Sequence, residues 1–141
     1  MKILMNALLV CSAALFIGCG KKVDRHEHGH HHGHGAHGPN GGELLEIGDH
    51  LAHLELLHDA DDKSVTLHLL GPDAKQAIPF DAPPKLNLIV DGNPLQLEMT
   101  GSNSTYTVIH ESFSGQLEGR VALRFDQKNY QITITHAHHH H

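Results

Sequence analysis

The chain has 141 residues, with 16 aspartates and glutamates against 10 lysines and arginines, so its formal net charge is −6 when its 17 histidines are counted as neutral. An acidic chain without a basic patch does not attract nucleic-acid phosphates, which argues against a nucleic-acid partner. The lack of tryptophan and an aromatic content of only 4% argue against a surface that stacks on bases or sugars.

The first nineteen residues are typical of an export signal. Lys2 precedes an apolar run over residues 3–17, which is short for a membrane span, since a span needs about 20 apolar residues. The run ends in Phe16-Ile17-Gly18-Cys19, which resembles a bacterial lipobox; this resemblance implies cleavage before Cys19 and acylation of its thiol. We therefore expect residues 1–18 to be a lipoprotein signal peptide. The alternatives are an ordinary signal peptide and an uncleaved anchor helix.

The expected processing determines the compartment and the available metal ligands. The mature chain is expected to be lipid-anchored outside the cytoplasm. Gly20 follows Cys19, and by the lipobox resemblance this implies the outer membrane, facing the periplasm, if the cell is Gram-negative. Cys11 leaves with the signal and Cys19 carries the lipid, so no thiol remains. Disulfides, thiolate metal sites and cysteine nucleophiles are then excluded, and any bound transition metal must use imidazole and carboxylate ligands.

Residues 19–41 form a polar segment rich in histidine and glycine, without apolar periodicity. Such a segment buries too little surface to offset its conformational entropy, so we predict a disordered tether with an end-to-end distance of roughly 25 Å. Its candidate metal ligands are His26, His28, His30, His31, His32, His34 and His37. Alternate residues of an extended chain point the same way, and glycines let the backbone bend, so neighbouring imidazoles can reach one ion. Zn, Cu, Ni or Co suits these donors. The alternative is a solvated linker that binds metal incidentally.

Residues 42–136 are predicted to form an all-β domain. Short alternating runs are separated by turn residues rich in Gly, Pro, Asp and Asn, and Asp91-Gly92 is typical of a tight hairpin. The predicted strands cover residues 43–47, 51–58, 65–70, 86–90, 95–99, 105–110, 119–125 and 130–136. Seven or eight short antiparallel strands at this spacing favour a small β-sandwich or a barrel.

The alternation also assigns faces to the predicted strands. One core is expected to contain Ala52, Leu54, Leu56, Val65, Leu67, Leu69, Leu86, Leu88, Val90, Leu95, Leu97, Met99, Val121, Leu123, Phe125, Tyr130, Ile132 and Ile134. A hairpin of strands 51–58 and 65–70 would place His68 opposite His53 or Glu55 on the other face. These three side chains are a candidate secondary metal patch on an exposed sheet surface; the alternative is an ordinary solvated face.

A second histidine cluster ends the chain, formed by His136, His138, His139, His140 and His141. We expect residues 137–141 to be a disordered tail whose imidazoles, together with His136, also bind metal. A cloning tag is the alternative. A run of four histidines rather than six, together with the retained signal segment, favours a native tail.

One segment resembles a known motif. His37-Gly38-Pro39-Asn40-Gly41-Gly42-Glu43-Leu44 is similar to the H-G-P-H-G-G-x-[LI] motif of a family of small His-rich exported bacterial proteins, and to a stretch in the periplasmic adaptor subunits of heavy-metal efflux systems. Residues 45–46, 58–60 and 65–70 extend the resemblance over about half the chain. Asn40 stands in place of the motif's second histidine, so only His37 carries over as a ligand. The resemblance implies an extracytoplasmic location and contact with metal.

These observations predict a membrane-anchored, extracytoplasmic transition-metal-binding protein. It would act as a metal buffer or chaperone, with a metal-efflux or other envelope protein as a possible recipient. The alternative is an envelope protein–protein binding module whose histidines are incidental or tune binding with pH. The predicted domain contains no H-E-x-x-H, G-x-S-x-G or P-loop motif, so we do not expect an enzyme, although a metal hydrolase built from residues distant in sequence is a third hypothesis.

Overall fold

The computed structural model describes residues 36–135, which form two antiparallel β-sheets and one short 3₁₀ helix. The nine strands are β1 (Glu43–Ile47), β2 (Ala52–Asp59), β3 (Ser64–Leu70), β4 (Lys85–Val90), β5 (Asn93–Glu98), β6 (Thr100–Ser102), β7 (Thr105–Ile109), β8 (Glu118–Phe125) and β9 (Lys128–Thr135), with η1 (Glu111–Ser114) between β7 and β8. The prediction of an all-β sandwich is confirmed.

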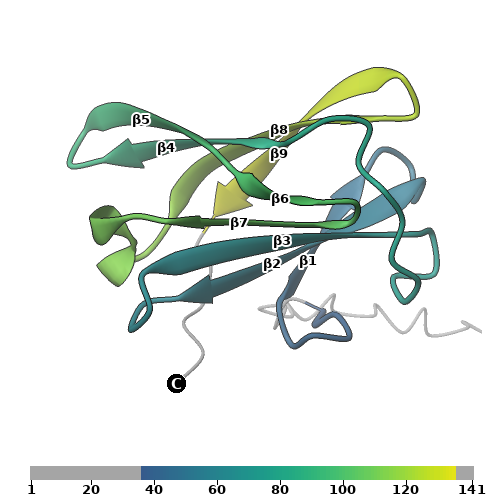
Figure 1. Cartoon of the computed structure of the whole chain (residues 1–141), viewed down its shortest axis with the longest axis horizontal. Helices are drawn as coiled ribbons and strands as arrows, with labels where there is room; N and C mark the ends of the chain where they lie inside the picture. Colours follow the sequence, from purple (N-terminus) through teal and green to yellow (C-terminus); the bar gives the residue numbers. More distant parts are fainter. Residues whose placement is uncertain (1–35, 136–141) are drawn as a thin grey trace, which may run out of the picture. The chain divides into compact units, whose positions relative to one another are not determined.

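The two sheets form the two layers of the sandwich (Figure 1). One has five strands in the order β1-β2-β3-β7-β6, and the other has four in the order β5-β4-β8-β9. The hairpin predicted at Asp91-Gly92 is present: both residues have positive φ, +49° and +77°, and Val90 pairs with Asn93 across the turn. Positive φ at both central positions is what a type I′ hairpin turn requires, which explains the Asp-Gly dipeptide.

The core lies between the sheets and follows the alternation of the strands. Of the predicted set, the buried members are Ala52, Leu54, Leu56, Val65, Leu67, Leu69, Leu86, Leu88, Met99, Val121, Leu123 and Ile134, whereas Val90, Leu95, Leu97, Phe125, Tyr130 and Ile132 are half-buried. The half-buried residues lie mostly on β5 and β9, which are the edge strands of the four-stranded sheet. Edge strands have a neighbour on one side only, so less of their inner face is covered.

The described residues form nine strands where seven or eight were expected, because the segment after the predicted strand 95–99 adds a strand of its own. β5 ends at Glu98, and Thr100–Ser102 forms β6, which pairs with β7 in the other sheet. The chain therefore crosses from one sheet to the other at the buried Met99 (Figure 1). Gly101 is required in β6, because a Cβ there would lie 2.2 Å from the carbonyl oxygen of Thr105.

Several predictions lie outside the described residues: the signal peptide over 1–18, Cys19, the arm as far as residue 35, and the histidines from His136 onward. Within residues 36–135, no helix has the length and apolarity needed to cross a membrane. One boundary is corrected. Residues 37–41 were assigned to the tether, but they form an ordered loop against β2, with a β-bridge between His37 and Glu43.

Candidate functional site

Four predicted site residues lie in the described part of the chain: His37, His53, Glu55 and His68. His37 is exposed, next to the bridge that begins the folded domain. The other three lie on β2 and β3, on the face of the five-stranded sheet that points away from the core. The register pairs Glu55 with His68, which is one of the two arrangements that the sequence allowed.

The face that carries Glu55 is covered, and this contradicts the prediction of an exposed patch. Glu55 has 0% of its surface exposed. One carboxylate oxygen accepts hydrogen bonds from the backbone N–H of Asn40 at 2.8 Å and of Gly42 at 3.0 Å, and the other accepts one from Nδ2 of Asn40 at 2.8 Å. A buried carboxylate requires such donors, because an unpaired buried charge is very costly. Glu55 therefore fastens the loop and does not offer its oxygens to a metal.

Residues 37–42, which we call the N-terminal loop, have a sequence suited to this covering role. The N–H of Gly38 donates to the carbonyl of Gly42 at 2.9 Å, and the N–H of Gly41 donates to the carbonyl of Gly38 at 3.0 Å. A Cβ at Gly38 would lie 2.4 Å from the Glu55 carboxyl carbon, and one at Gly42 would lie 2.6 Å from the Leu56 carbonyl oxygen. Gly41 has φ of +86°, a conformation that glycine adopts without strain. The glycines let the backbone approach β2 closely enough to reach Glu55.

The two histidines of the predicted patch have other partners. His68 Nδ1 lies 3.0 Å from the Thr105 hydroxyl on β7, and His53 Nδ1 lies 3.3 Å from the Gly71 carbonyl oxygen. In residues 36–135, no three histidine, aspartate or glutamate side chains are arranged to hold a metal ion. The predicted patch of His53, Glu55 and His68 is therefore not a preformed centre.

Two further histidines, His58 and His110, make contacts that hold η1 in place. His58 is 3% exposed, and its Nε2 donates to the carbonyl oxygen of Phe113 at 2.6 Å. The rings of these two residues also meet edge to face, with centroids 6.5 Å apart. His110 precedes η1, and its Nδ1 accepts a hydrogen bond from the N–H of Ser112 at 3.2 Å. Both imidazoles hold η1 to the end of the sandwich.

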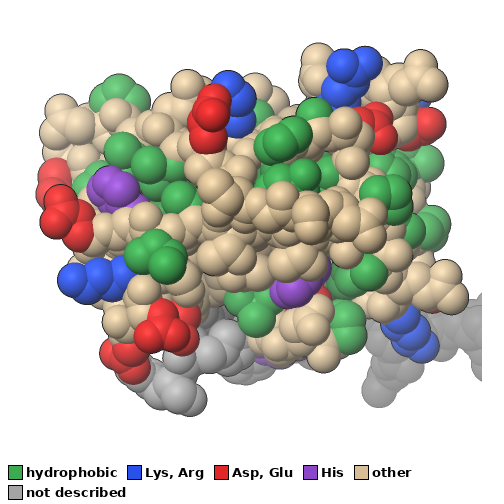
Figure 2. All heavy atoms as spheres, in the orientation of Figure 1, with side chains coloured by type: hydrophobic (Ala, Val, Ile, Leu, Met, Phe, Trp, Pro, Cys, Tyr) green, Lys and Arg blue, Asp and Glu red, His purple; other side chains and the backbone are tan. Residues whose placement is uncertain are grey.

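Histidines are scattered over the surface of the sandwich. On the face shown in Figure 2 the histidine side chains are separated from one another, and acidic and basic side chains are interspersed. On this face of the described residues the histidines do not form a cluster like the runs in residues 26–37 and 136–141 of the sequence.

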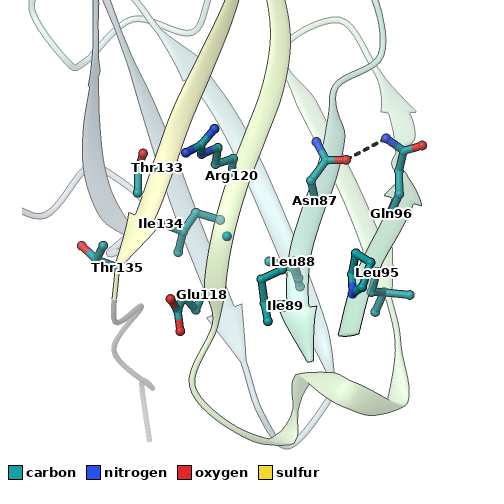
Figure 3. Close-up of a pocket in the computed structure, with 12 residues that line it drawn as sticks. Asn87, Leu88, Ile89, Leu95, Gln96, Glu118, Arg120, Thr133, Ile134 and Thr135 are labelled. Atoms are coloured by element: carbon teal, nitrogen blue, oxygen red, sulfur yellow. Dashed lines mark hydrogen bonds between the residues drawn. The ribbon is translucent and has the colours of Figure 1, made fainter. Parts of the chain in front are cut away.

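A hollow of about 720 Å³ lies on the outer face of the four-stranded sheet. Residues from all four strands line it: Asn87, Leu88, Ile89, Pro94, Leu95, Gln96, Glu118, Gly119, Arg120, Thr133, Ile134 and Thr135. Figure 3 shows Asn87 and Gln96 facing each other from neighbouring strands, joined by a hydrogen bond of 2.7 Å. Ile89 is 51% exposed. The lining combines polar side chains of the outer face, such as Asn87, Gln96 and Arg120, with the exposed Ile89.

The sequence did not predict this hollow. The residues that line it come from four strands, and the order of these strands in the sheet depends on pairing between distant parts of the chain. It also treated Asn40 only as a departure from a histidine motif. The presence of an acidic residue within a predicted strand, together with a Gly-Pro-Asn-Gly-Gly run just before the domain, was the available signal for a buried carboxylate.

Comparison with known proteins adds no assignment. No protein-family model, curated protein or solved structure matches this chain.

Proposed function

We propose that this protein is a membrane-anchored, extracytoplasmic binder of transition-metal ions that acts as a metal buffer or chaperone. The observation that carries the proposal is the density of imidazoles: seven histidines occur within residues 26–37, in a chain whose two cysteines both lie within the first nineteen residues. Neutral imidazole is a preferred ligand for Zn²⁺, Cu²⁺, Ni²⁺ and Co²⁺, and few other roles call for so many histidines in so short a segment.

The fold supports this proposal by joining the arm firmly to a stable domain. His37 is exposed at the start of the N-terminal loop, and the next residues are bound to Glu55. The last imidazole of the arm therefore has a defined place on the domain. A recipient envelope protein, such as a metal exporter, would meet the metal and the domain together.

Protons and metal ions compete for the same imidazole nitrogens, and this competition sets the pH range in which such a protein binds metal. Coordination requires the neutral form of imidazole, so uptake falls as pH decreases below about 6. The chain would hold metal at neutral pH and release it in an acidified compartment.

Calorimetric titration of the full chain with Zn²⁺, Cu²⁺ and Ni²⁺ tests the proposal. One variant replaces the seven histidines of residues 26–37 with serine, and a second does the same for residues 138–141. Both keep the lipobox and the folded domain, and His68→Ser is the control for loss of a histidine outside the arms. We expect the arm variants to lose most of the bound metal. An unchanged stoichiometry would contradict the proposal.

The hollow on the four-stranded sheet favours a second candidate, an envelope protein–protein binding module. Ile89 is half-exposed there between polar residues, and an exposed apolar patch with a polar rim is a common feature of docking surfaces. This candidate predicts a partner whose binding survives a chelator and is abolished by Ile89→Glu. Binding that requires metal and ignores Ile89→Glu would contradict it.

A further inference from the structure

The turn between β1 and β2 brings His50 and Glu46 together with His53, which was also part of the predicted patch. Glu46 Oε2 lies 3.2 Å from Nδ1 of His50. The rings of His50 and His53 have centroids 6.4 Å apart, and Glu46 and His53 are register partners across β1 and β2. Each of the three side chains is thus a neighbour of the other two.

The local backbone holds this arrangement. Gly48 and His50 have positive φ, +62° and +55°, and the N–H of Leu51 donates to the carbonyl oxygen of Ile47 at 3.1 Å. Glu46 uses its second oxygen to accept the backbone N–H of His50 at 3.0 Å. A left-handed conformation is uncommon for a residue with a Cβ, so the carboxylate stabilises both the turn and the position of the imidazole.

The hydrogen-bond partners of the His50 and His53 rings determine which nitrogen of each ring is available to bind a metal ion. A carbonyl oxygen can only accept, so Nδ1 of His53 carries the proton that it directs at Gly71. The Glu46 carboxylate likewise accepts from Nδ1 of His50 in the neutral ring. Each imidazole then presents the lone pair of Nε2. Metal-bound histidines commonly have this arrangement, with the second nitrogen donating to a carboxylate or a backbone carbonyl.

The ring separation is close to that of a shared ion. With metal–nitrogen bonds of about 2.0–2.1 Å, two imidazoles on one ion have centroids roughly 5–6 Å apart. The observed 6.4 Å is slightly longer. The His50 side chain is 77% exposed and lies on a turn, so it is free to rotate toward His53.

We propose that Nε2 of His50 and Nε2 of His53 bind a late first-row divalent ion, Zn²⁺ or Cu²⁺, with Glu46 and the Gly71 carbonyl orienting the two rings. Because the described residues supply only these two imidazoles, water or a donor from another molecule completes the coordination. Such a site exchanges metal readily. It deepens the proposed function, on which it rests for its supply of metal, by giving the domain its own acceptor position.

Histidine footprinting with diethyl pyrocarbonate tests the site, using peptide mass spectrometry to measure each histidine separately in the full chain in detergent, with and without Zn²⁺ or Cu²⁺. We expect metal to protect His50 and His53, and to leave His68 and His110 reactive. Glu46→Gln should raise the half-protecting metal concentration by about tenfold or more, as loss of an outer-shell partner does. Glu98→Gln is the matched control, since it removes the same charge from an exposed glutamate on β5.

The readouts separate the two proposals. Protection of residues 26–37 without protection of His50 and His53 overturns the turn site and leaves the arm proposal standing. Protection of His50 and His53 alone supports the turn site and contradicts the arm proposal. Equal effects of Glu46→Gln and Glu98→Gln would exclude the orienting role of Glu46. His50→Asn keeps a residue that tolerates positive φ, and it should abolish protection of His53 if the two rings share an ion.

Discussion

Replacement of Glu55 by alanine should detach the N-terminal loop from β2. In the native structure the carboxylate accepts three hydrogen bonds, from Asn40 N, Asn40 Nδ2 and Gly42 N. Asn40 is exposed, so water can replace the partner of both its donors. Gly42 is buried, and its N–H would lose its acceptor in a place where water does not reach without opening the loop.

These contacts set the size of the expected effect. A hydrogen bond to a charged group contributes about 1.5–3 kcal/mol, and a buried donor left without a partner costs about 1–3 kcal/mol. With the lost packing of the side chain against Gly38 and Gly42, Glu55→Ala should lower the free energy of unfolding by about 2–4 kcal/mol. Glu55→Gln should cost only about 1–2 kcal/mol, because its amide oxygen can accept from both backbone N–H groups and the Asn40 amide can turn over to accept from its NH₂.

Urea unfolding of the full chain, followed by far-ultraviolet circular dichroism, measures these differences, and amide hydrogen exchange at Gly42 reports the loop directly. The control is Glu98→Ala, whose side chain is 79% exposed and should change stability by less than about 0.5 kcal/mol. If Glu55→Ala unfolded like this control and the Gly42 amide kept its protection, the assigned role of the carboxylate would be wrong.

Three other perturbations have definite expected outcomes. Gly38→Ala would place a Cβ 2.4 Å from the Glu55 carboxyl carbon, whereas a Cβ at Gly115 meets nothing within 4 Å. In thermal melts, Gly38→Ala should therefore lower the melting temperature strongly and Gly115→Ala should leave it almost unchanged. Equal melting temperatures would contradict the close packing of the loop. Phe113→Ala removes a side chain with 0% exposure and should cost about 3–5 kcal/mol in urea unfolding; a cost below about 1 kcal/mol would place Phe113 outside the core. The pKa of Asp73 is lowered by hydrogen bonds from the backbone N–H groups of the second and third residues after it. Its stabilising contribution is therefore complete above the ordinary value of 3.8 and is lost as pH falls through the lower folded value, so the stability difference between the native chain and Asp73→Asn should shrink in melts below that pH and stay constant above it.

The sequence pattern predicted the strands and turns whose form depends on residues that are close together in the chain. Alternation identified the buried faces of β2 and β3, and the Asp91-Gly92 pair identified the β4–β5 hairpin. It also limited the partner of His68 to His53 or Glu55, since a short turn between two alternating strands permits few registers, and the structure has Glu55. What alternation could not show is whether an outward face is covered. The Glu55 face was assigned to solvent because the covering loop lacks periodicity.

Non-local pairing explains most of the remaining differences. β3 pairs with β7 and β4 pairs with β8, and neither partnership has a signal in the short runs themselves. Phe113 and Phe80 are buried although they lie outside the strands, in segments with no period from which burial could be inferred. The pairing of His50 with His53 depends on a left-handed residue within a turn, and residue spacing does not reveal such a conformation.

The attachment of the N-terminal loop also determines how the domain responds to mechanical load. β1 is an edge strand, and a pull applied to its first residue alone would peel it from β2 one hydrogen bond at a time. Tension entering at Ala36 first meets the contacts of Ala36 and His37 with β1, and then the hydrogen bonds of Asn40 and Gly42 to Glu55 on β2. The load is thus divided between two strands, and the buried carboxylate carries the share that reaches the second one.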